Sequence, residues 1–485
     1  MDVNERIELI HEVETSVWID KVNQTYAQGR FTEWVSSMHP NRLPCRLDSG
    51  FLHGAYNVGI KFRFSDDTAW LIRFPRAGNI CAALADEKVA MEVEALSLIR
   101  AKTTIPVPTV RAWGLAAQNE LGLGPFVMMD FIDGVSLNDV LRSDHSSRLV
   151  TAEIRDGEIE GLYRQFVGFL LQLWKLDFDR LGSLPTPVTG FAAPPRPLTW
   201  KVHDILQTGG VDTFGMFLGL SRDRTQAFAT ATEYFQYVAQ QDWEQLLQQA
   251  NSIGGEYSGR SKYAAFQVLS SVIPDYIDPR FDHGPFKLIC DDLGLANMLV
   301  RSRDDLTIVG VVDLEWSYAG PAQLFGSAPW WLLMARLNNW DAEFDQDEVP
   351  ALLARYLRYL DILKRVLDEE AANEETEEPR RHDARELLNL IRRSETSGSM
   401  WLHMLLSCGF NDESSVPFSQ LRQRFGLEEW KQRKEEFYDT AEIEAFVQRK
   451  LAQLEQHEKD LEETSAHKEA VDAGVMTRED FIATL

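Results

Sequence analysis

Cysteine is scarce in this chain of 485 residues, which contains only four. They stand far apart at positions 45, 81, 290 and 408, and no two form a C-x-x-C pair. This spacing argues against a structural zinc site and against a disulfide framework. It is typical of proteins from a reducing compartment.

Basic residues are also few. Lysine and arginine total 49 against 75 aspartates and glutamates, which gives a net charge of −26. Such a charge repels nucleic acid, so we expect no nucleic-acid partner. It would attract a cationic small molecule, but much of the acidic excess lies in 341–348, 367–378 and the C-terminal helices, where it is typical of solvated faces.

Long hydrophobic runs are missing as well. No apolar stretch reaches the roughly 18 residues that cross a bilayer. The N-terminus is acidic and polar, unlike a secretory signal or an Arg-rich transit peptide. We therefore expect a cytoplasmic protein without a membrane partner. The patterns G-x-x-x-x-G-K-[ST], G-x-G-x-x-G, H-E-x-x-H and G-x-S-x-G are absent too, which removes several common chemistries.

The hydrophobic periodicity divides the chain into three parts. Residues 1–48 have helical periodicity and read as an N-terminal extension. Residues 49–133 predict a small β-rich lobe, and residues 134–485 a large, mostly helical lobe that is interrupted by an acidic, mobile segment at 367–382. The expected fold class is therefore α+β with two lobes and a hinge near residue 130.

The strands of the small lobe are visible in the sequence. "NVGIKFRF" (57–64) alternates between apolar and basic residues, and "AWLIRFP" (69–75) returns as a second strand. A helix with an acidic first turn follows over 85–102. "GPFVMMDFIDG" (124–134) is then a buried strand that ends in a glycine turn.

One stretch of the large lobe groups polar residues in a pattern that is typical of a catalytic or metal-binding loop. "KLICDDLGLANMLV" (287–300) places Asp292 five residues before Asn297, directly ahead of a strand. The next strand, "LTIVGVV", forms a hairpin with it and brings Asp313 back to the same end. A carboxylate and an amide oxygen suit Mg²⁺, which takes few protein ligands, and a second carboxylate is left to accept a proton.

This loop, followed by a strand that ends "GVVDLEWSYAGP" in place of D-F-G, resembles the protein-kinase-like phosphotransferases, and most closely their aminoglycoside phosphotransferase and choline kinase branch. "FDRLGSL" and "PWWLL" resemble a fungal group within that branch. The resemblance implies a protein-kinase-like two-lobe fold and transfer of a phosphoryl group from ATP, with Mg²⁺, to a hydroxyl of a small amine-bearing or sugar-like acceptor. In that case Asp292 is the catalytic base, and Asn297 and Asp313 hold the metal.

The same resemblance assigns several residues within 49–133 to nucleotide binding. Gly54 in "HGAYN" would let backbone amides approach the phosphates, although the turn read alone is an ordinary hairpin. Arg73 stands where protein kinases have the nucleotide-binding lysine, and read alone it is a surface arginine. Glu92 would pair with that cation, with Glu94 as the alternative.

Two further sets of residues follow from the resemblance. Backbone groups near Met129 and Phe131, in the hinge strand, would hydrogen-bond adenine. Glu315, Trp316 and Tyr318 would line the acceptor pocket, where aromatic faces and a carboxylate suit an ammonium group.

One position departs from the family pattern. The catalytic loop usually begins with histidine two residues before the base, and here that residue is Cys290. A small cysteine can fill a structural position, and no neighbouring histidine other than His283 could activate it as a nucleophile. Asp291 is expected to be exposed to solvent. The alternative to a kinase is therefore a catalytically silent, kinase-like nucleotide-binding or scaffold protein.

Overall fold

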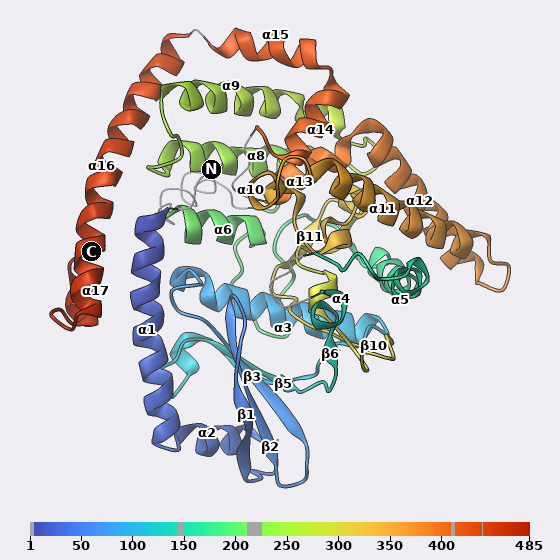
Figure 1. Ribbon diagram of the computed structural model, residues 1–485. Helices are drawn as coiled ribbons and strands as arrows, with labels where there is room; N and C mark the ends of the chain where they lie inside the picture. Colours follow the sequence, from blue (N-terminus) through green and yellow to red (C-terminus); the bar gives the residue numbers. More distant parts are fainter. Residues whose placement is uncertain (1–3, 144–148, 211–225, 409–412, 439) are drawn as a thin grey trace.

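The computed structural model describes residues 4–143, 149–210, 226–408, 413–438 and 440–485. The chain forms a lobe built on a β-sheet and a larger lobe built mainly from helices (Figure 1). The predicted α+β architecture with two lobes is confirmed.

The sheet of the first lobe has five antiparallel strands in the order β1-β2-β3-β5-β4. Their bounds are β1 Cys45–His53, β2 Asn57–Phe64, β3 Ala69–Pro75, β4 Val110–Gly114 and β5 Phe126–Asp130. Strand β1 therefore begins inside the segment that the sequence assigns to the extension and continues into the lobe. The two β-rich stretches at 57–64 and 69–75 form neighbouring strands as expected.

Helices cover both faces of this sheet. The first face carries α1 (Glu5–Ala27) and α2 (Arg30–Met38), whose aromatic residues pack on the apolar side of β2. The second face carries α3 (Ala85–Lys102). Strand β5 lies between these layers and alternates between them, with Met128 in the first core and Met129 in the second. Because both of its faces are covered, its sequence is almost continuously apolar.

The second lobe contains most of the helices. Their bounds are α4 Leu137–Leu141, α5 Asp156–Trp174, α6 Trp200–Gly209, α8 Ala231–Gln248, α9 Glu256–Val272, α10 Trp340–Glu343, α11 Val349–Ala372, α12 Glu378–Ser397, α13 Ser399–Ser407, α14 Val416–Phe425, α15 Leu427–Tyr438, α16 Ala441–Asp472 and α17 Arg478–Ala483. The helix expected over 222–250 corresponds to α8, and residues 211–225 lie outside the described residues.

The prediction of a mobile break at 367–382 is wrong for most of that segment, because α11 continues to Ala372 and α12 begins at Glu378. The acidic side chains there pair with arginines, including Arg380 with Glu370 and Arg385 with Glu378. The charges thus lie on helix surfaces, where they are compatible with regular structure.

Two small sheets in the second lobe hold the loop that the sequence singles out. Strand β9 (Met298–Val300) pairs with β10 (Ile308–Val311) and with β6 (Val135–Ser136). Strand β8 (Phe286–Cys290) pairs with β11 (Ser317–Gly320) and with β7 (Asp177–Phe178). The predicted hairpin is therefore present, and the loop after β8 is held between two antiparallel pairs.

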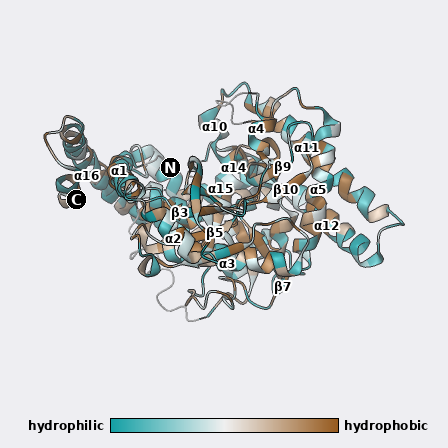
Figure 2. Cartoon of the chain, turned by 90° about the horizontal axis from the view of Figure 1, so that it is seen from below, coloured by the Kyte–Doolittle hydropathy of each residue, from teal (hydrophilic) through white to brown (hydrophobic). Residues whose placement is uncertain are grey.

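Helices from the two ends of the chain lie against each other. Helix α16 runs alongside α1 in both views (Figures 1 and 2), and Phe481 of α17 packs on Ile10 and Val13. Helix α1 also contacts both lobes. At its start Asn4 donates a hydrogen bond to Gly209 of α6 (3.2 Å), and further along Trp18 donates one to the carbonyl of Leu123 in the sheet lobe (3.1 Å).

Candidate active site

The loop between β8 and β9 is fixed at both ends by backbone hydrogen bonds. The amide of Asp291 donates to the carbonyl of Trp316 (3.1 Å), and the amide of Val312 donates to the carbonyl of Asn297 (2.9 Å). The second bond sets the end of β10 beside the start of β9, so Asp313 follows directly next to Asn297. Asp313 has φ +63°, a left-handed conformation that is uncommon for residues other than glycine and that recurs at functional sites.

Asp292 is held by Asn297, as the five-residue spacing suggests. The amide nitrogen of Asn297 donates to the backbone carbonyl of Asp292 (2.8 Å) and to its Oδ2 (2.9 Å). Burial raises the pKa of Asp292 to about 6, with Arg336 opposing this rise and Asp313 adding to it. A carboxylate with this pKa is ionised at neutral pH and can still accept a proton, which are the properties of a general base.

Arg73 on β3 forms the centre of a buried cluster of charges. Its guanidinium pairs with Glu92 on α3 (2.5 Å), with Asp313, and with Glu315 (3.2 Å). The structure thus distinguishes between the two candidate glutamates. Glu94 instead accepts hydrogen bonds from the backbone amides of residues 188 and 189 in the Pro-rich loop.

Two members of the cluster are missing from the sequence-based prediction. The ammonium of Lys88 donates to Glu315 Oε2 (2.5 Å) and to Asn57 Oδ1 (2.9 Å), and the Asn57 amide donates to the same Glu315 oxygen (2.7 Å). Lys88 precedes Glu92 by four residues, so both lie on one face of α3. That spacing is a signal from which Lys88 could have been found.

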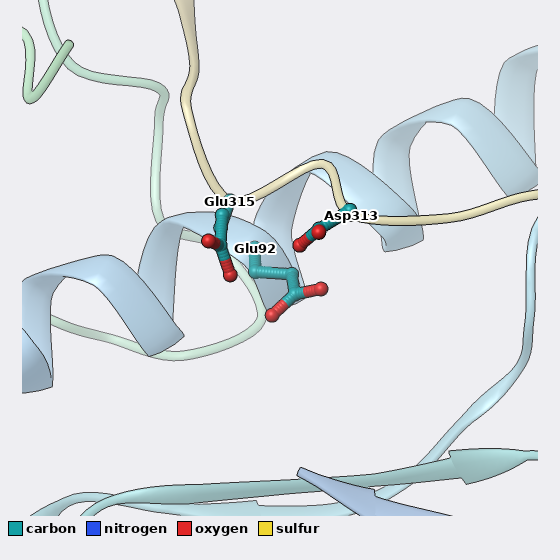
Figure 3. Close-up of side chains that lie close together, drawn as sticks. All are labelled: Glu92, Asp313 and Glu315. Carbon is teal, nitrogen blue, oxygen red and sulfur yellow. The ribbon is translucent and has the colours of Figure 1, made fainter. Parts of the chain in front are cut away.

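The three carboxylates of this cluster suit a divalent cation. Oxygens of Glu92, Asp313 and Glu315 lie within 4.8 Å of one another, and their carboxylates point toward a common space (Figure 3). Burial and the charge of Asp313 raise the pKa of Glu315 to about 8, so Glu315 is mainly protonated at neutral pH and would become ionised on binding a cation. Among the described residues Glu315 Oε1 is buried without a hydrogen-bond partner, which is a costly state that a cation would relieve.

The pKa values of the cluster agree with a charged Asp313. Burial raises the pKa of this group, but the charges of Arg73 and Lys88 outweigh that effect and hold it below its ordinary value. Asp313 also keeps 29 % of its side chain exposed, whereas Glu315 keeps 1 %. Asp313 is thus the carboxylate most accessible to a ligand. Because the Asn297 amide nitrogen faces Asp292, its carbonyl oxygen is the atom that could face a metal.

The remaining nucleotide-binding candidates lie around the sheet lobe. The Gly54 amide donates to the carbonyl of Asn57 (2.9 Å) in the turn between β1 and β2, and Asn57 continues into the charged cluster. A Cβ atom at Gly54 would lie 3.2 Å from that carbonyl oxygen, which is a close contact. Met129 is buried in β5, and the Phe131 amide already donates to the carbonyl of Ala69 (3.0 Å). An adenine contact at Phe131 would therefore involve its carbonyl oxygen.

The structure encloses two of the three residues expected in the acceptor pocket. Glu315 belongs to the charged cluster, and Trp316 packs with Tyr56 and His203 in a core. Both residues directly precede β11, and their side chains lie in the interior. Each is 1 % exposed, so neither lines an open pocket. Tyr318 is also buried, but it borders a cavity in the helical lobe.

Asp291 is not the solvent-exposed carboxylate that the sequence suggests. It is half-buried, and it accepts hydrogen bonds from the Tyr318 hydroxyl (3.1 Å) and from the Trp200 amide (3.3 Å). Cys290 accepts a hydrogen bond from the Ser317 hydroxyl (3.3 Å). Burial raises the pKa of Cys290 to about 12, which disfavours the thiolate that a nucleophile would need.

Arg336 is a site residue with no local signal in the sequence. Its guanidinium lies 4.2 Å from the ring centres of both Trp200 and Trp330, so it is stacked between two indoles. It also lies 3.6 Å from Asp292 Oδ1. The three stacked side chains come from distant parts of the chain and meet only through folding.

One known protein family matches more than half of the chain. The model of the phosphotransferase enzyme family matches residues 49–366. No curated relative matches the sequence. Among solved structures, the chain is similar to a type I macrolide 2′-phosphotransferase (13 % identity, 82 % of this chain and 96 % of the other, TM-score 0.36). It is also similar to a macrolide 2′-phosphotransferase from Brachybacterium faecium (13 %, 74 % and 96 %, 0.34) and to an amicoumacin kinase in complex with AMP-PNP and Ca²⁺ (10 %, 80 % and 88 %, 0.34).

Proposed function

The chain belongs to the phosphotransferase enzyme family, and on that premise we propose that it is an ATP- and Mg²⁺-dependent kinase of a small molecule with a hydroxyl group. The observation that carries the proposal is the convergence of Asp292, Asn297 and Asp313 at one end of a hairpin, beside the pair formed by Arg73 and Glu92. These groups come from both lobes, so the site lies where the lobes meet.

Each residue has a role that its surroundings support. Asp292 accepts the proton of the acceptor hydroxyl, in an orientation fixed by Asn297. Arg73 binds phosphate oxygens, and Glu92 holds its guanidinium in place. Asp313 and Asn297 would hold Mg²⁺, with Glu315 close behind. When bound, this ion would neutralise charge on the phosphoryl oxygens.

The backbone near Met129 and Phe131 is the proposed adenine contact, and the turn at Gly54 the proposed phosphate cover. An amine-bearing or sugar-like acceptor has less support, because Glu315 and Trp316 are enclosed and the ammonium of Lys88, a residue of the protein itself, lies 5.6 Å from the centre of the Trp316 ring. The proposed acceptor is therefore defined here only by its hydroxyl.

The second candidate is a nucleotide-binding or scaffold protein that transfers no phosphoryl group. Two contacts favour it in addition to the cysteine at position 290. Arg73 donates a hydrogen bond to Asp313, so a protein cation already pairs with the expected metal ligand. Arg336 lies beside Asp292 in the same way.

Thermal unfolding with ATP in Mg²⁺ or in EDTA, followed by assays of phosphoryl transfer, separates the two candidates. Asp313→Asn should abolish the Mg²⁺-dependent shift, because the metal loses a charged ligand. Asp292→Asn should keep that shift and lower transfer by about 10²- to 10⁴-fold. Asp304→Asn, in the exposed turn of the same hairpin, is the matched control and should change neither. Absence of a Mg²⁺-dependent shift in the wild-type chain would refute the kinase.

A further inference from the structure

A cavity of about 180 Å³ lies in the helical lobe directly beside the catalytic loop. Cys290, Asp291 and Leu293 of that loop line it. Arg336 lines it as well and lies 3.6 Å from Asp292, so this residue connects the cavity to the proposed base. The cavity therefore begins where an acceptor must bring its hydroxyl.

The rest of the lining is mainly apolar. It comes from α5, β8, α8, α11, α12 and α13, with side chains that include Phe166, Leu170, Phe235, Leu288, Leu363 and Met404. An apolar cavity of about 150 Å³ stays dry and binds benzene. A cavity of this size and composition is thus suited to an aromatic ring or a branched alkyl group.

The polar groups of the lining differ in their state, and Nη2 of Arg336 is buried without a hydrogen-bond partner among the described residues. His403 contacts Gln323 (2.7 Å) and Ser327, and burial lowers its pKa to about 3, so it carries no charge. Arg336 is charged, and burial raises the pKa of Asp291 to about 7, so this carboxyl group is only partly ionised at neutral pH. Asp291 accepts two hydrogen bonds, and Arg336 is a cation at the same mouth.

This distribution disfavours a molecule with several ammonium groups. Such a molecule would have to lose water from its charges against apolar walls. A molecule with one apolar group and one hydroxyl avoids this cost, because the apolar group gains from burial while the hydroxyl remains near Asp292.

Resting on the proposed function, we propose that the acceptor is a neutral amphipathic alcohol whose ring-sized apolar group enters this cavity. In the reaction, Asp292 takes the hydroxyl proton and the alcohol oxygen forms a bond to the γ-phosphorus of ATP. The bond from that phosphorus to the oxygen bridging the β- and γ-phosphates breaks, and ADP leaves with the electron pair. The product is the phosphate monoester of the alcohol.

Ligand-observed NMR on the full chain tests the ligand class with 2-phenylethanol as the neutral aryl alcohol and kanamycin as the polycationic sugar. We expect saturation transfer to 2-phenylethanol and none to kanamycin. Binding of kanamycin without binding of 2-phenylethanol would overturn the inference. The same two compounds then serve as acceptors with ATP and Mg²⁺, and phosphorylation of kanamycin alone would overturn it too.

Three variants locate the binding. Ala328→Leu adds volume inside the cavity and should weaken 2-phenylethanol binding at least tenfold. Leu170→Ala enlarges the cavity and should shift the preference toward 2-(2-naphthyl)ethanol by about tenfold. Leu357→Ala, the same change in a half-buried position of α11 outside the lining, is the matched control and should leave both affinities within twofold. Unchanged binding in a folded Ala328→Leu chain would overturn the inference, and Leu170→Ala decides if that variant does not fold.

The MgATP-dependent thermal shift separates the two levels of the proposal. A retained shift without binding of the aryl alcohol leaves the kinase in place and removes the apolar acceptor. Cavity binding of the alcohol without a Mg²⁺-dependent shift refutes the kinase and leaves the class of ligand supported. Binding, shift and transfer together, with transfer lost in Ala328→Leu while the shift remains, support both.

Discussion

Replacing Arg73 with methionine tests whether the buried charges are balanced as described. The guanidinium is buried and pairs with Glu92, Asp313 and Glu315, and Lys88 is the other cation of the cluster. Removal of Arg73 makes the net charge of the five groups more negative by one unit and leaves Lys88 as the only cation among them. Breaking a buried ion pair on one side costs about 3–5 kcal/mol, because the partner charge stays buried. We expect Arg73→Met to lower the free energy of unfolding by this amount in urea titrations at neutral pH.

The same variant should respond more strongly to Mg²⁺. A ligand that binds only the folded chain at 100 times its Kd adds about 2.7 kcal/mol. A site that is more negative by one unit should bind the ion more tightly, so Mg²⁺ should restore more stability to the variant than it adds to the wild type. Repeating the titrations with and without MgCl₂ measures this difference.

Arg63→Met provides the matched control. Arg63 belongs to the neighbouring strand and pairs with Asp48 on the surface, where solvent screens the pair. The Arg63→Met variant should lose much less free energy of unfolding than Arg73→Met, and this loss should not depend on Mg²⁺. Equal losses in the two variants would refute the charge balance, and so would equal responses to Mg²⁺.

Three other perturbations have defined outcomes. Cys290→His should keep the unfolding midpoint, because this position borders a cavity with room for an imidazole; loss of folding in circular dichroism would contradict this. Burial lowers the pKa of His403 to about 3, against about 6.5 in the unfolded chain. The contribution of neutral His403 to the free energy of unfolding is therefore complete above pH 6.5 and is lost as the pH falls toward 3. Chemical unfolding from pH 7 to 4 should therefore show a dependence of up to about 1.4 kcal/mol per pH unit from this group, and His403→Gln should lack it; identical slopes would rule the group out. Phe481→Ala removes a fully buried ring packed on Val13 and should lower the free energy of unfolding by about 3 kcal/mol and speed hydrogen exchange in α1. Ile482→Ala, on the exposed side of α17, should do neither. Equal hydrogen exchange in the two variants would show that α17 does not hold α1.

Features that depend on neighbouring residues were predictable from the sequence. The alternation in 57–64 and the apolar run in 124–134 report which faces of a strand are covered, and the structure contains both strands. The loop with Asp292 and Asn297 and the return of the strand before Asp313 lie within about two dozen residues, so strand periodicity alone relates them. The roles of these residues remain predictions.

Features that depend on distant contacts were not predictable. Arg336 acquires its position by stacking between Trp200 and Trp330, which a single sequence does not relate. Glu315 reads as a pocket residue because it follows a metal-type aspartate, yet Lys88 and Asn57 draw it into the interior. Asp291 reads as exposed for the same reason, since the hydroxyl of Tyr318 lies 27 residues away in the chain.

The two ends of the chain restrict how the molecule can move. Segments before residue 49 and after residue 366 lie outside the family match, yet α1 touches both lobes and is itself held by α16 and α17. Two bodies connected at one point can rotate about it in any direction. Here α1 connects the two lobes a second time, away from that point. We therefore expect the lobes to keep one main rotation, about the line that joins the two connections. A pair of fluorophores placed across that line would report substrate entry as a change in a single angle.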